Sequence, residues 1–390
     1  MNCAGFLNLP EWQEKLQKIL TGLGKNEILR LPVLGSENVE RPWVALDSGD
    51  FYSAVETGIF FQGSHRPVKF PVNLVTSDPE IAIKRLLDGK YRTTFYSAAI
   101  GATFPVLKIL SSGFEVAKPE KFISQNDAVS GFILSRMEMK NFSLEEATHD
   151  AQWEKIVPGS PNYHLHGLVT RNRLALQIAD IFGCLIDPEK IHTTGINSLK
   201  VEDVRIARKM GYSIRLLGIA QKTESSVKAT VEACLIPMKY FLAQTRGGSE
   251  IIYALSSDGQ SQVYACPGTS CETVVRGILT DLFEPCAKVR EPETVDKVEN
   301  FADKFYLRFN LINFTDTMSR LFSVFAANDM EISTIYQPER DFSRESDNND
   351  SGNVVFITGK TEKEKLLILF EEIKNNVKLA SLEAFFRFFR

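Results

Sequence analysis

Three residues in the middle of the chain could take part in acid–base or anion chemistry: His164, His166 and Arg173. A histidine changes its charge near neutral pH, so either histidine could exchange a proton with a substrate. Two positions apart, they would lie on one side of an extended segment. Arg173 could hold an anion, but a guanidinium keeps its protons at physiological pH. The alternative, which we favour, is that both histidines are ordinary surface or hydrogen-bonding residues.

A second polar group, Asn313-Phe314-Thr315-Asp316, falls at a predicted junction between a strand and a helix. The free backbone amides at the start of a helix attract anions, and Asn313 and Thr315 could add hydrogen bonds to such a ligand. Asp316 would instead repel a carboxylate. The interpretation that we favour is that Thr315 or Asp316 caps the helix.

The sequence lacks the glycine pattern of a dinucleotide site. Such a site begins as a strand followed by G-x-G-x-x-G at the start of a helix, because the glycines let the backbone approach the pyrophosphate. Gly22-Leu23-Gly24 is the nearest fragment, but it follows a helix-like stretch and has no third glycine. A loop that ends the helix is the favoured interpretation, so we predict no cofactor-binding residue here.

Composition and charge exclude several classes of protein. Hydrophobic residues make up 44% and charged residues 24% of the 390, and the net charge of -4 gives no reason to expect a nucleic-acid partner. No apolar run approaches the roughly 20 residues of a membrane span, and the start of the chain does not resemble a signal peptide. The six cysteines form no C-x-x-C pair, which predicts reduced thiols and no metal site. We expect a cytoplasmic protein without a membrane partner.

The pattern of apolar residues predicts three regions that position these groups. Residues 1–120 form a loose α/β region, with a helix over Glu11 to Leu23, strands over Trp43 to Leu46 and Val72 to Val75, and a helix over Leu107 to Gly113. Residues 121–290 indicate helices packed on a mixed sheet: helices over Leu144 to Trp153, Leu174 to Phe182 and Asp203 to Met210, and strands over Val227 to Leu235 and Ile251 to Leu255. Glu291 to Asp303, which is charged and contains Pro292, is predicted to be a linker.

Residues 304–390 indicate the order strand, helix, strand, strand, helix, strand of a ferredoxin-like domain. The predicted elements are strands over Phe305 to Ile312, Glu331 to Gln337 and Val354 to Gly359, and helices over Thr317 to Asn328 and Glu362 to Asn376. Asp341 to Gly352 is predicted to be a solvated loop. The fold class is therefore α/β combined with α+β.

Several separate blocks in the middle of the chain resemble the catalytic domain of homoserine dehydrogenase. They are Gly195-Ile196 with Val201 to Asp203, Ala207 to Tyr212, Ile214 to Leu217, and, upstream, Ala98 to Ala102 with Pro105 to Leu107. Downstream, Leu235 to Pro237 and Asp281-Leu282 also match. The resemblance covers most of residues 72–285, and it implies a Rossmann-like first region, here truncated or divergent, and an NAD(P) cofactor.

The last region resembles an ACT domain, a small amino-acid-binding module. Phe305 to Phe309 matches its first strand and Glu331 to Gln337 its second. The resemblance implies a homodimer and a small amino-acid ligand held near Asn313, Thr315 and Asp316. The family's Asp-x-Pro-Gly effector turn is replaced by Asn313 to Asp316.

The positions that carry the family's chemistry differ in this chain. The family's acidic segment aligns so that Pro158 stands at its glutamate, Val169 at its aspartate and Arg173 at its catalytic lysine. Asp78-Pro79 replaces an Asn-Lys pair, and Asp127 to Gly131 replaces an Asn-Gly-Thr-Thr-Asn turn. Near Cys266 to Ser270, only Pro267-Gly268 remains of a glycine-rich loop. A small shift of the alignment would bring Asp150 or Glu154 to the acidic position.

Three hypotheses follow. The first is a homoserine-dehydrogenase-like protein that has lost the activity and serves as a binding or regulatory scaffold. The second is an active NAD(P)-dependent homoserine dehydrogenase of threonine and methionine biosynthesis with a divergent site. The third is an amino-acid sensor that works through Asn313, Thr315 and Asp316.

Overall fold

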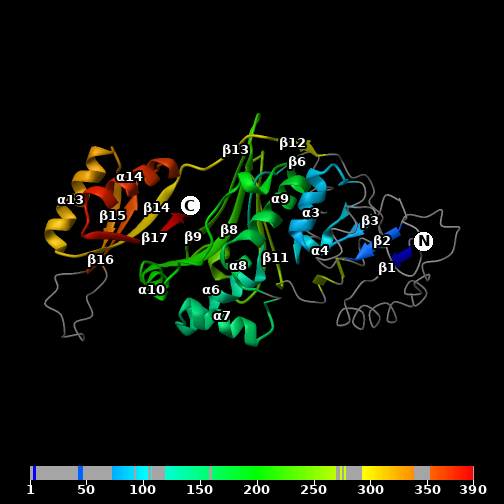
Figure 1. Ribbon diagram of the computed structural model, residues 1–390, viewed down its shortest axis with the longest axis horizontal. Helices are drawn as coiled ribbons and strands as arrows, with labels where there is room; N and C mark the ends of the chain where they lie inside the picture. Colours follow the sequence, from blue (N-terminus) through cyan, green and yellow to red (C-terminus); the bar gives the residue numbers. More distant parts are fainter. Residues whose placement is uncertain are drawn as a thin grey trace, which may run out of the picture. The chain divides into compact units, whose positions relative to one another are not determined.

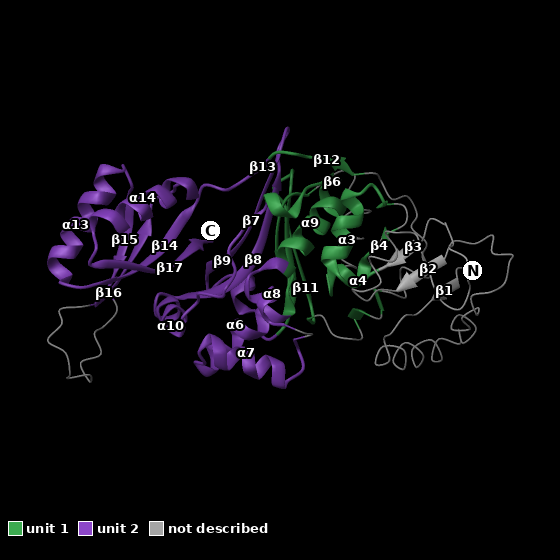
Figure 2. Ribbon diagram, viewed as in Figure 1, with its two compact units in different colours: residues 1–128, 169–190, 248–297 green, residues 129–168, 191–247, 298–390 purple. Residues whose placement is uncertain are grey.

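The computed structural model describes residues 3–5, 43–46, 73–91, 94–103, 107, 119–157, 160–268, 273–274, 276–277, 292–337 and 352–389 (Figure 1). The chain divides into two compact units (Figure 2). Unit 1 comprises residues 1–128, 169–190 and 248–297, and unit 2 comprises residues 129–168, 191–247 and 298–390. The predicted helix over Glu11 to Leu23 lies outside the described residues, as does the one over Leu107 to Gly113 apart from Leu107.

Unit 1 contains a sheet of four short parallel strands in chain order: β1 (Cys3–Gly5), β2 (Trp43–Leu46), β3 (Asn73–Val75) and β4 (Thr94–Phe95). Helix α3 (Pro79–Leu87) connects β3 to β4, and the short helix α4 (Ser97–Ile100) follows. Asp78 is the N-cap of α3, because its carboxylate accepts a hydrogen bond from the backbone amide of Glu80 at 2.7 Å. The two strands predicted near 43–46 and 72–75 are confirmed.

Unit 1 also contains three antiparallel strands of the 11-stranded sheet that the described residues form, with β10 (Glu250–Ser256) between β5 (Pro119–Gln125) and β11 (Ser261–Cys266). Helix α9 (Leu168–Phe182) lies against these strands, with the rings of Phe182 and Phe122 5.2 Å apart. Strand β6 (Cys184–Leu185) pairs with β12 (Glu293–Thr294), and the 3-10 helix η3 (Pro188–Lys190) follows β6. The segment predicted as a linker, Glu291 to Asp303, therefore contains a short strand in unit 1, β12, and a second one, Val298–Glu299, in unit 2.

Unit 2 is built on the long antiparallel hairpin of β8 (Tyr212–Lys222) and β9 (Val227–Pro237). Two short strands, β7 (His192–Thr193) and β13 (Val298–Glu299), pair parallel with β9. The helices are α6 (Ala128–Lys140), α7 (Leu144–Trp153), α8 (Asn162–Leu165), α10 (Val201–Lys209) and α11 (Phe241–Gln244). Helix α7 has the bounds that the sequence predicted, and a capping box between Ser143 and Glu146 fixes its start.

Residues 304–388 form a β-α-β-β-α-β arrangement, called here the C-terminal module. Its elements are β14 (Lys304–Leu311), α13 (Phe314–Ala327), β15 (Ile332–Tyr336), β16 (Gly352–Thr358), α14 (Lys363–Asn376) and β17 (Ala380–Phe388). The four strands are antiparallel in the order β17-β14-β16-β15, and β17 also pairs parallel with β9. The predicted order of elements is confirmed, and unit 2 is a mixed α/β structure on a large mixed sheet.

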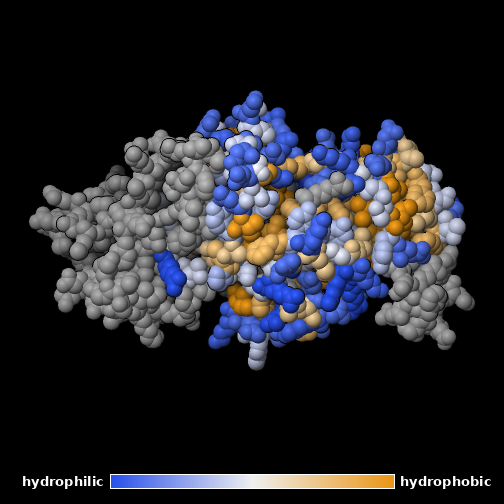
Figure 3. Space-filling view, turned by 180° about the vertical axis from the view of Figure 1, so that it is seen from behind, coloured by the Kyte–Doolittle hydropathy of each residue, from blue (hydrophilic) through white to orange (hydrophobic). Residues whose placement is uncertain are grey.

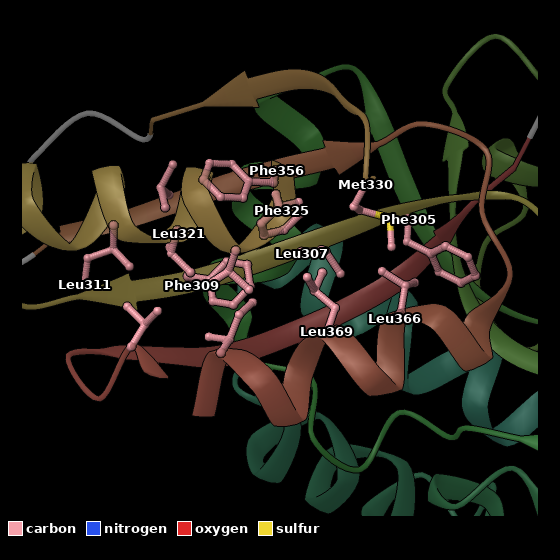
Figure 4. Packing of buried hydrophobic residues seen from close by; sticks show 14 residues of the cluster. Phe305, Leu307, Phe309, Leu311, Leu321, Phe325, Met330, Phe356, Leu366 and Leu369 are labelled. Atoms are coloured by element: carbon pink, nitrogen blue, oxygen red, sulfur yellow. The ribbon is translucent and has the colours of Figure 1, made fainter. Parts of the chain in front are cut away.

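The core of the C-terminal module lies between its sheet and its two helices (Figure 4). Alternate residues of β14, namely Phe305, Leu307, Phe309 and Leu311, point toward α13 and α14 and are fully buried. On the face shown in Figure 3, apolar atoms lie in several tracts separated by polar ones. No helix among the described residues is both long enough and apolar enough to span a bilayer.

Two adjacent leucines of α14 give a matched test of this core. Leu366 is 0% exposed inside it, whereas Leu367 is 50% exposed. We expect Leu366→Ala to lower the free energy of unfolding by about 2–5 kcal/mol, because it leaves a cavity, and Leu367→Ala to lower it by less than about 1 kcal/mol. Urea unfolding of both variants measures the difference, and equal losses would show that the core is wrongly placed.

Candidate functional site

Arg173 lies on the buried side of α9 and is held by three groups of unit 1. Its Nε donates to the carbonyl oxygen of Ala99 at 3.1 Å, and its Nη1 donates to the carbonyl oxygen of Asn126 at 2.5 Å. Nη1 also pairs with the carboxylate Oε1 of Glu250 at 3.3 Å. Arg173 as a whole is 8% exposed. Its donors are therefore engaged inside the protein.

Glu250 is the counter-ion of Arg173 and is completely buried. Its second carboxylate oxygen, Oε2, accepts a hydrogen bond from the backbone amide of Ala102 at 2.8 Å. An ionised carboxylate is tolerated in such a place only when charges and donors compensate it. The pair thus joins α9, the segment after α4, the end of β5 and the start of β10.

A network of neutral polar side chains continues from this pair along α9. Gln177 accepts hydrogen bonds from Ser124 at 2.8 Å and from the Asn126 amide at 3.1 Å, and it donates to Thr103 at 3.4 Å. The Asn126 amide also donates to the carbonyl of Thr170 at 3.4 Å. Amide and hydroxyl groups do not titrate near neutral pH, so the network can orient neighbours but cannot act as an acid or base.

The two histidines are not placed as the sequence predicted. The segment is helical, with His164 inside α8 and His166 at its C-cap, so the expectation of an extended segment is wrong. Positions two apart on a helix point in different directions. His164 is buried and His166 is exposed. Both histidines belong to unit 2 and Arg173 to unit 1, and neither histidine is among the hydrogen-bond partners of Arg173 described above.

The acids considered as substitutes have other partners. Asp150 pairs with Nε of Arg136 at 2.7 Å, and Glu154 pairs with Nη2 of Arg136 at 3.3 Å. Val169, at the family's aspartate position, is a buried apolar residue of α9. Pro158 lies outside the described residues.

Glycines that match the family are explained by packing. A Cβ on Gly195 would lie 2.0 Å from the carbonyl oxygen of Leu165, and one on Gly268 would lie 1.8 Å from that of Gly248. Such approaches exclude every other residue type. These positions preserve the fold whether or not the chain performs chemistry.

The parallel sheet shows a feature that the sequence analysis missed. Strand β1 ends at Gly5, and in a dinucleotide-binding fold the phosphate-binding glycines follow the first strand in the sequence. Read in that register, Gly5-Phe6-Leu7-Asn8-Leu9-Pro10 keeps only the first glycine of G-x-G-x-x-G. A three-residue strand gives too short a pattern to be recognised. The fragment Gly22 to Gly24 lies outside the described residues.

At the junction of β14 and α13, the favoured cap interpretation is wrong. The helix begins at Phe314, so Asn313 is the N-cap residue, with a left-handed φ of 53° and no side-chain capping bond. The Asp316 carboxylate instead accepts a hydrogen bond from Arg320, one turn later, at 2.9 Å. In the first turn, this carboxylate also suits the helix dipole. Thr315 lies between them, and a ligand role for the three residues stays a prediction.

The buried Glu232 of β9 was also missed by the sequence analysis. It is bound by Lys363 at 2.9 Å and Arg387 at 2.6 Å. Burial opposes its ionisation, but these two cations hold the pKa of Glu232 below its usual value. A lone glutamate in an otherwise apolar strand, as in Val231-Glu232-Ala233-Cys234-Leu235, is the signal that predicts such a partner. Glu250, before Ile251-Ile252, shows the same signal.

Comparison with known proteins shows a similarity to homoserine dehydrogenases. Residues 105–283 match the family model of homoserine dehydrogenase. The homoserine dehydrogenase of Lactococcus lactis subsp. lactis is 21% identical over 338 residues, which are 82% of this chain and 77% of that protein.

Solved structures of homoserine dehydrogenases share the fold. One from Thiobacillus denitrificans superposes with a TM-score of 0.79 at 18% identity, covering 100% of this chain and 98% of that chain. A mutant hyperthermophilic archaeal homoserine dehydrogenase in complex with NADPH has a TM-score of 0.50 at 16% identity, covering 71% of this chain and 84% of that one.

The two glutamates that pair with arginines of α9 test the buried pair. We expect Glu250→Gln to lower the free energy of unfolding by about 3–5 kcal/mol, because it leaves the buried Arg173 charge without its counter-ion. Glu189→Gln is the control, since Glu189 pairs with Arg171 at the surface, with a side chain 74% exposed, and should cost less than about 1 kcal/mol. Chemical denaturation measures both variants. A Glu250→Gln variant as stable as the control would contradict the buried pair.

Proposed function

We propose that this chain, which belongs to the homoserine dehydrogenase family, has lost the dehydrogenase reaction and keeps the fold as a binding or regulatory scaffold. The reaction for which its relatives are named oxidises the alcohol of homoserine with a nicotinamide cofactor. It needs a group that can exchange the hydroxyl proton near neutral pH and a site for the cofactor. The proposal concerns both the acid–base group and the cofactor site.

The observation that supports the proposal most strongly is the state of Arg173. A lysine can give up its proton when it is desolvated, whereas a guanidinium cannot. Arg173 is moreover bound to Glu250 and to two backbone carbonyls. The substitution thus turns the position of a catalytic group into a fixed internal ion pair.

Helix α9 itself supplies no substitute for the missing acid–base group. The other buried polar side chains of α9 are those of Thr170, Asn172 and Gln177, which do not exchange protons near pH 7. In the sheet of unit 1, the segment after β1 has leucine and proline where the second and third phosphate-binding glycines would stand. An NADPH site like that of the archaeal relative would need different contacts here.

The regulatory part of the proposal falls on the C-terminal module. We assign it to the ACT-like class because its β-α-β-β-α-β order and antiparallel sheet fit that class. Asn313, Thr315 and Asp316 lie at its first strand–helix junction, which is the candidate position for a small amino-acid ligand. A homodimer remains part of the same proposal.

The proposal predicts that the purified chain does not reduce NADP⁺ or NAD⁺ in the presence of homoserine. Loss of the acid–base group alone should lower the rate by about 10²–10⁴-fold relative to an active enzyme. The Lactococcus lactis homoserine dehydrogenase serves as the positive control, and replacing its lysine that aligns with Arg173 by arginine should reproduce that loss.

Absorbance of the reduced cofactor measures the rate in both directions of the reaction. A homoserine-dependent rate in this chain comparable to that of the control would overturn the proposal in favour of an active, divergent homoserine dehydrogenase. An Arg173→Met variant would then show whether Arg173 takes part.

A further inference from the structure

A cluster of charged side chains lies where the C-terminal module joins the β8–β9 hairpin. Lys363, the first residue of α14, and Arg387, near the end of β17, both bind the carboxylate of Glu232 on β9. The side chains of these three residues are 1–4% exposed. The cluster is therefore an internal electrostatic contact between the module and the hairpin.

The backbone contact at the same place is short. Strand β17 pairs with β9 only through Arg387 with Cys234 and Phe388 with Leu235, and the amide of Phe389 donates to the carbonyl of Leu235 at 2.8 Å. Within the module, by contrast, β17 pairs with β14 from Lys304 to Leu311. The junction therefore has fewer backbone pairs than the other side of β17, and the charged side chains of the cluster add to them.

His192 is the member of the cluster that solvent can reach. It lies on β7, which pairs with β9, and its side chain is 38% exposed. Its ring Nε2 contacts the ammonium of Lys363, lies 3.1 Å from the Thr194 hydroxyl and 3.5 Å from the Glu232 carboxylate. Because an ammonium can only donate, the contact with Lys363 needs a neutral imidazole with a free lone pair on Nε2.

The charges that face His192 come from every element packed around it. Glu232 of β9 and Glu364 of α14 attract a protonated ring, whereas Lys363 of α14 and Arg387 of β17 repel it. Asp303, which precedes β14, lies 3.6 Å from Arg387 and completes the set. With a neutral His192, the two buried cations Lys363 and Arg387 face the buried carboxylate of Glu232 and the partly exposed carboxylate of Asp303. Protonation adds a positive charge in contact with Lys363 and removes its acceptor.

We propose that His192 makes the docking of the C-terminal module on β9 dependent on pH, with the junction closed at neutral pH and loosened in weakly acidic solution. The proposal does not depend on whether the chain oxidises homoserine. It gives the fold a regulatory device, because protonation of one partly exposed ring changes the contact between the module and the hairpin.

The direction follows from the pKa of His192. Burial of the ring, and then the charge of Lys363, lower this pKa in the folded protein. The unfolded or undocked chain therefore takes up the proton first as the pH falls below about 6.5. Docking is fully stable above that pH and weakens below it, until the folded-state pKa is also passed.

Hydrogen–deuterium exchange of the peptide that spans β17 tests the proposal on the full chain. Rates are corrected for the intrinsic effect of pH and compared at about pH 7.5 and about pH 5.5, on either side of the ordinary histidine pKa. We expect the protection of β17 against exchange to fall at the lower pH. The fall is up to about tenfold for each pH unit between the pKa of His192 in the unfolded chain and its lower pKa in the folded chain. The peptide of β5, which belongs to unit 1, gives the reference within the same molecule.

Two histidine variants make the comparison specific. His192→Gln replaces the titratable ring by a neutral amide, so the protection of β17 should be independent of pH. His149→Gln replaces an exposed histidine of α7 and should behave as the wild type. Should His192→Gln fail to fold, Lys363→Gln takes its place: without the repelling ammonium, the response to acid should shrink.

The proposal is overturned by a wild type whose β17 protection is the same at both pH values. It is also overturned by an acid response that persists unchanged in His192→Gln or, in its place, in Lys363→Gln. A response present in the wild type and in His149→Gln, but absent in His192→Gln, supports it.

Discussion

The buried ion pair between Arg173 and Glu250 is the interaction on which the described part of unit 1 depends. Four segments that are distant in the sequence meet at these two side chains: α9, the residues after α4, the end of β5 and the start of β10. A carboxylate with no solvent exposure is stable only in the presence of such a partner. The same requirement keeps the guanidinium in place, so the group that determines the local structure cannot also serve as a mobile proton carrier.

Close packing of backbone sets a second constraint on this fold. The positions that match homoserine dehydrogenases include Gly195 and Gly268, where neighbouring backbone leaves no room for a side chain. At such positions any side chain would clash with neighbouring backbone, so this fold requires glycine there. Arg173 answers to a structural constraint as well, because its guanidinium is bound to Glu250 and to two backbone carbonyls inside unit 1.

Much of the fold could be predicted from the sequence, because capping residues and apolar periods are local. Helix α7 was predicted to the residue, and the order of elements in the C-terminal module was predicted correctly. Helix α9 was predicted to begin at Leu174, six residues late, because Thr170, Asn172 and Arg173 interrupt its apolar pattern. All three residues are buried, and the partners of Arg173 lie far away in the sequence. The ion-pair partners of Arg173 and Glu232 are brought together by tertiary contacts, which local sequence patterns do not encode. The one sequence signal for them is a single glutamate, Glu250 or Glu232, within or beside an apolar run.

The measurement that tests the account most directly is calorimetric titration of the full chain with NADPH and NADH, extended to millimolar concentrations. The proposed loss of the dehydrogenase reaction and of its cofactor site predicts no heat of binding beyond dilution. Saturable binding at micromolar concentrations would contradict the account, because it would show that the cofactor site survives and that the chain remains equipped for the reaction of its family.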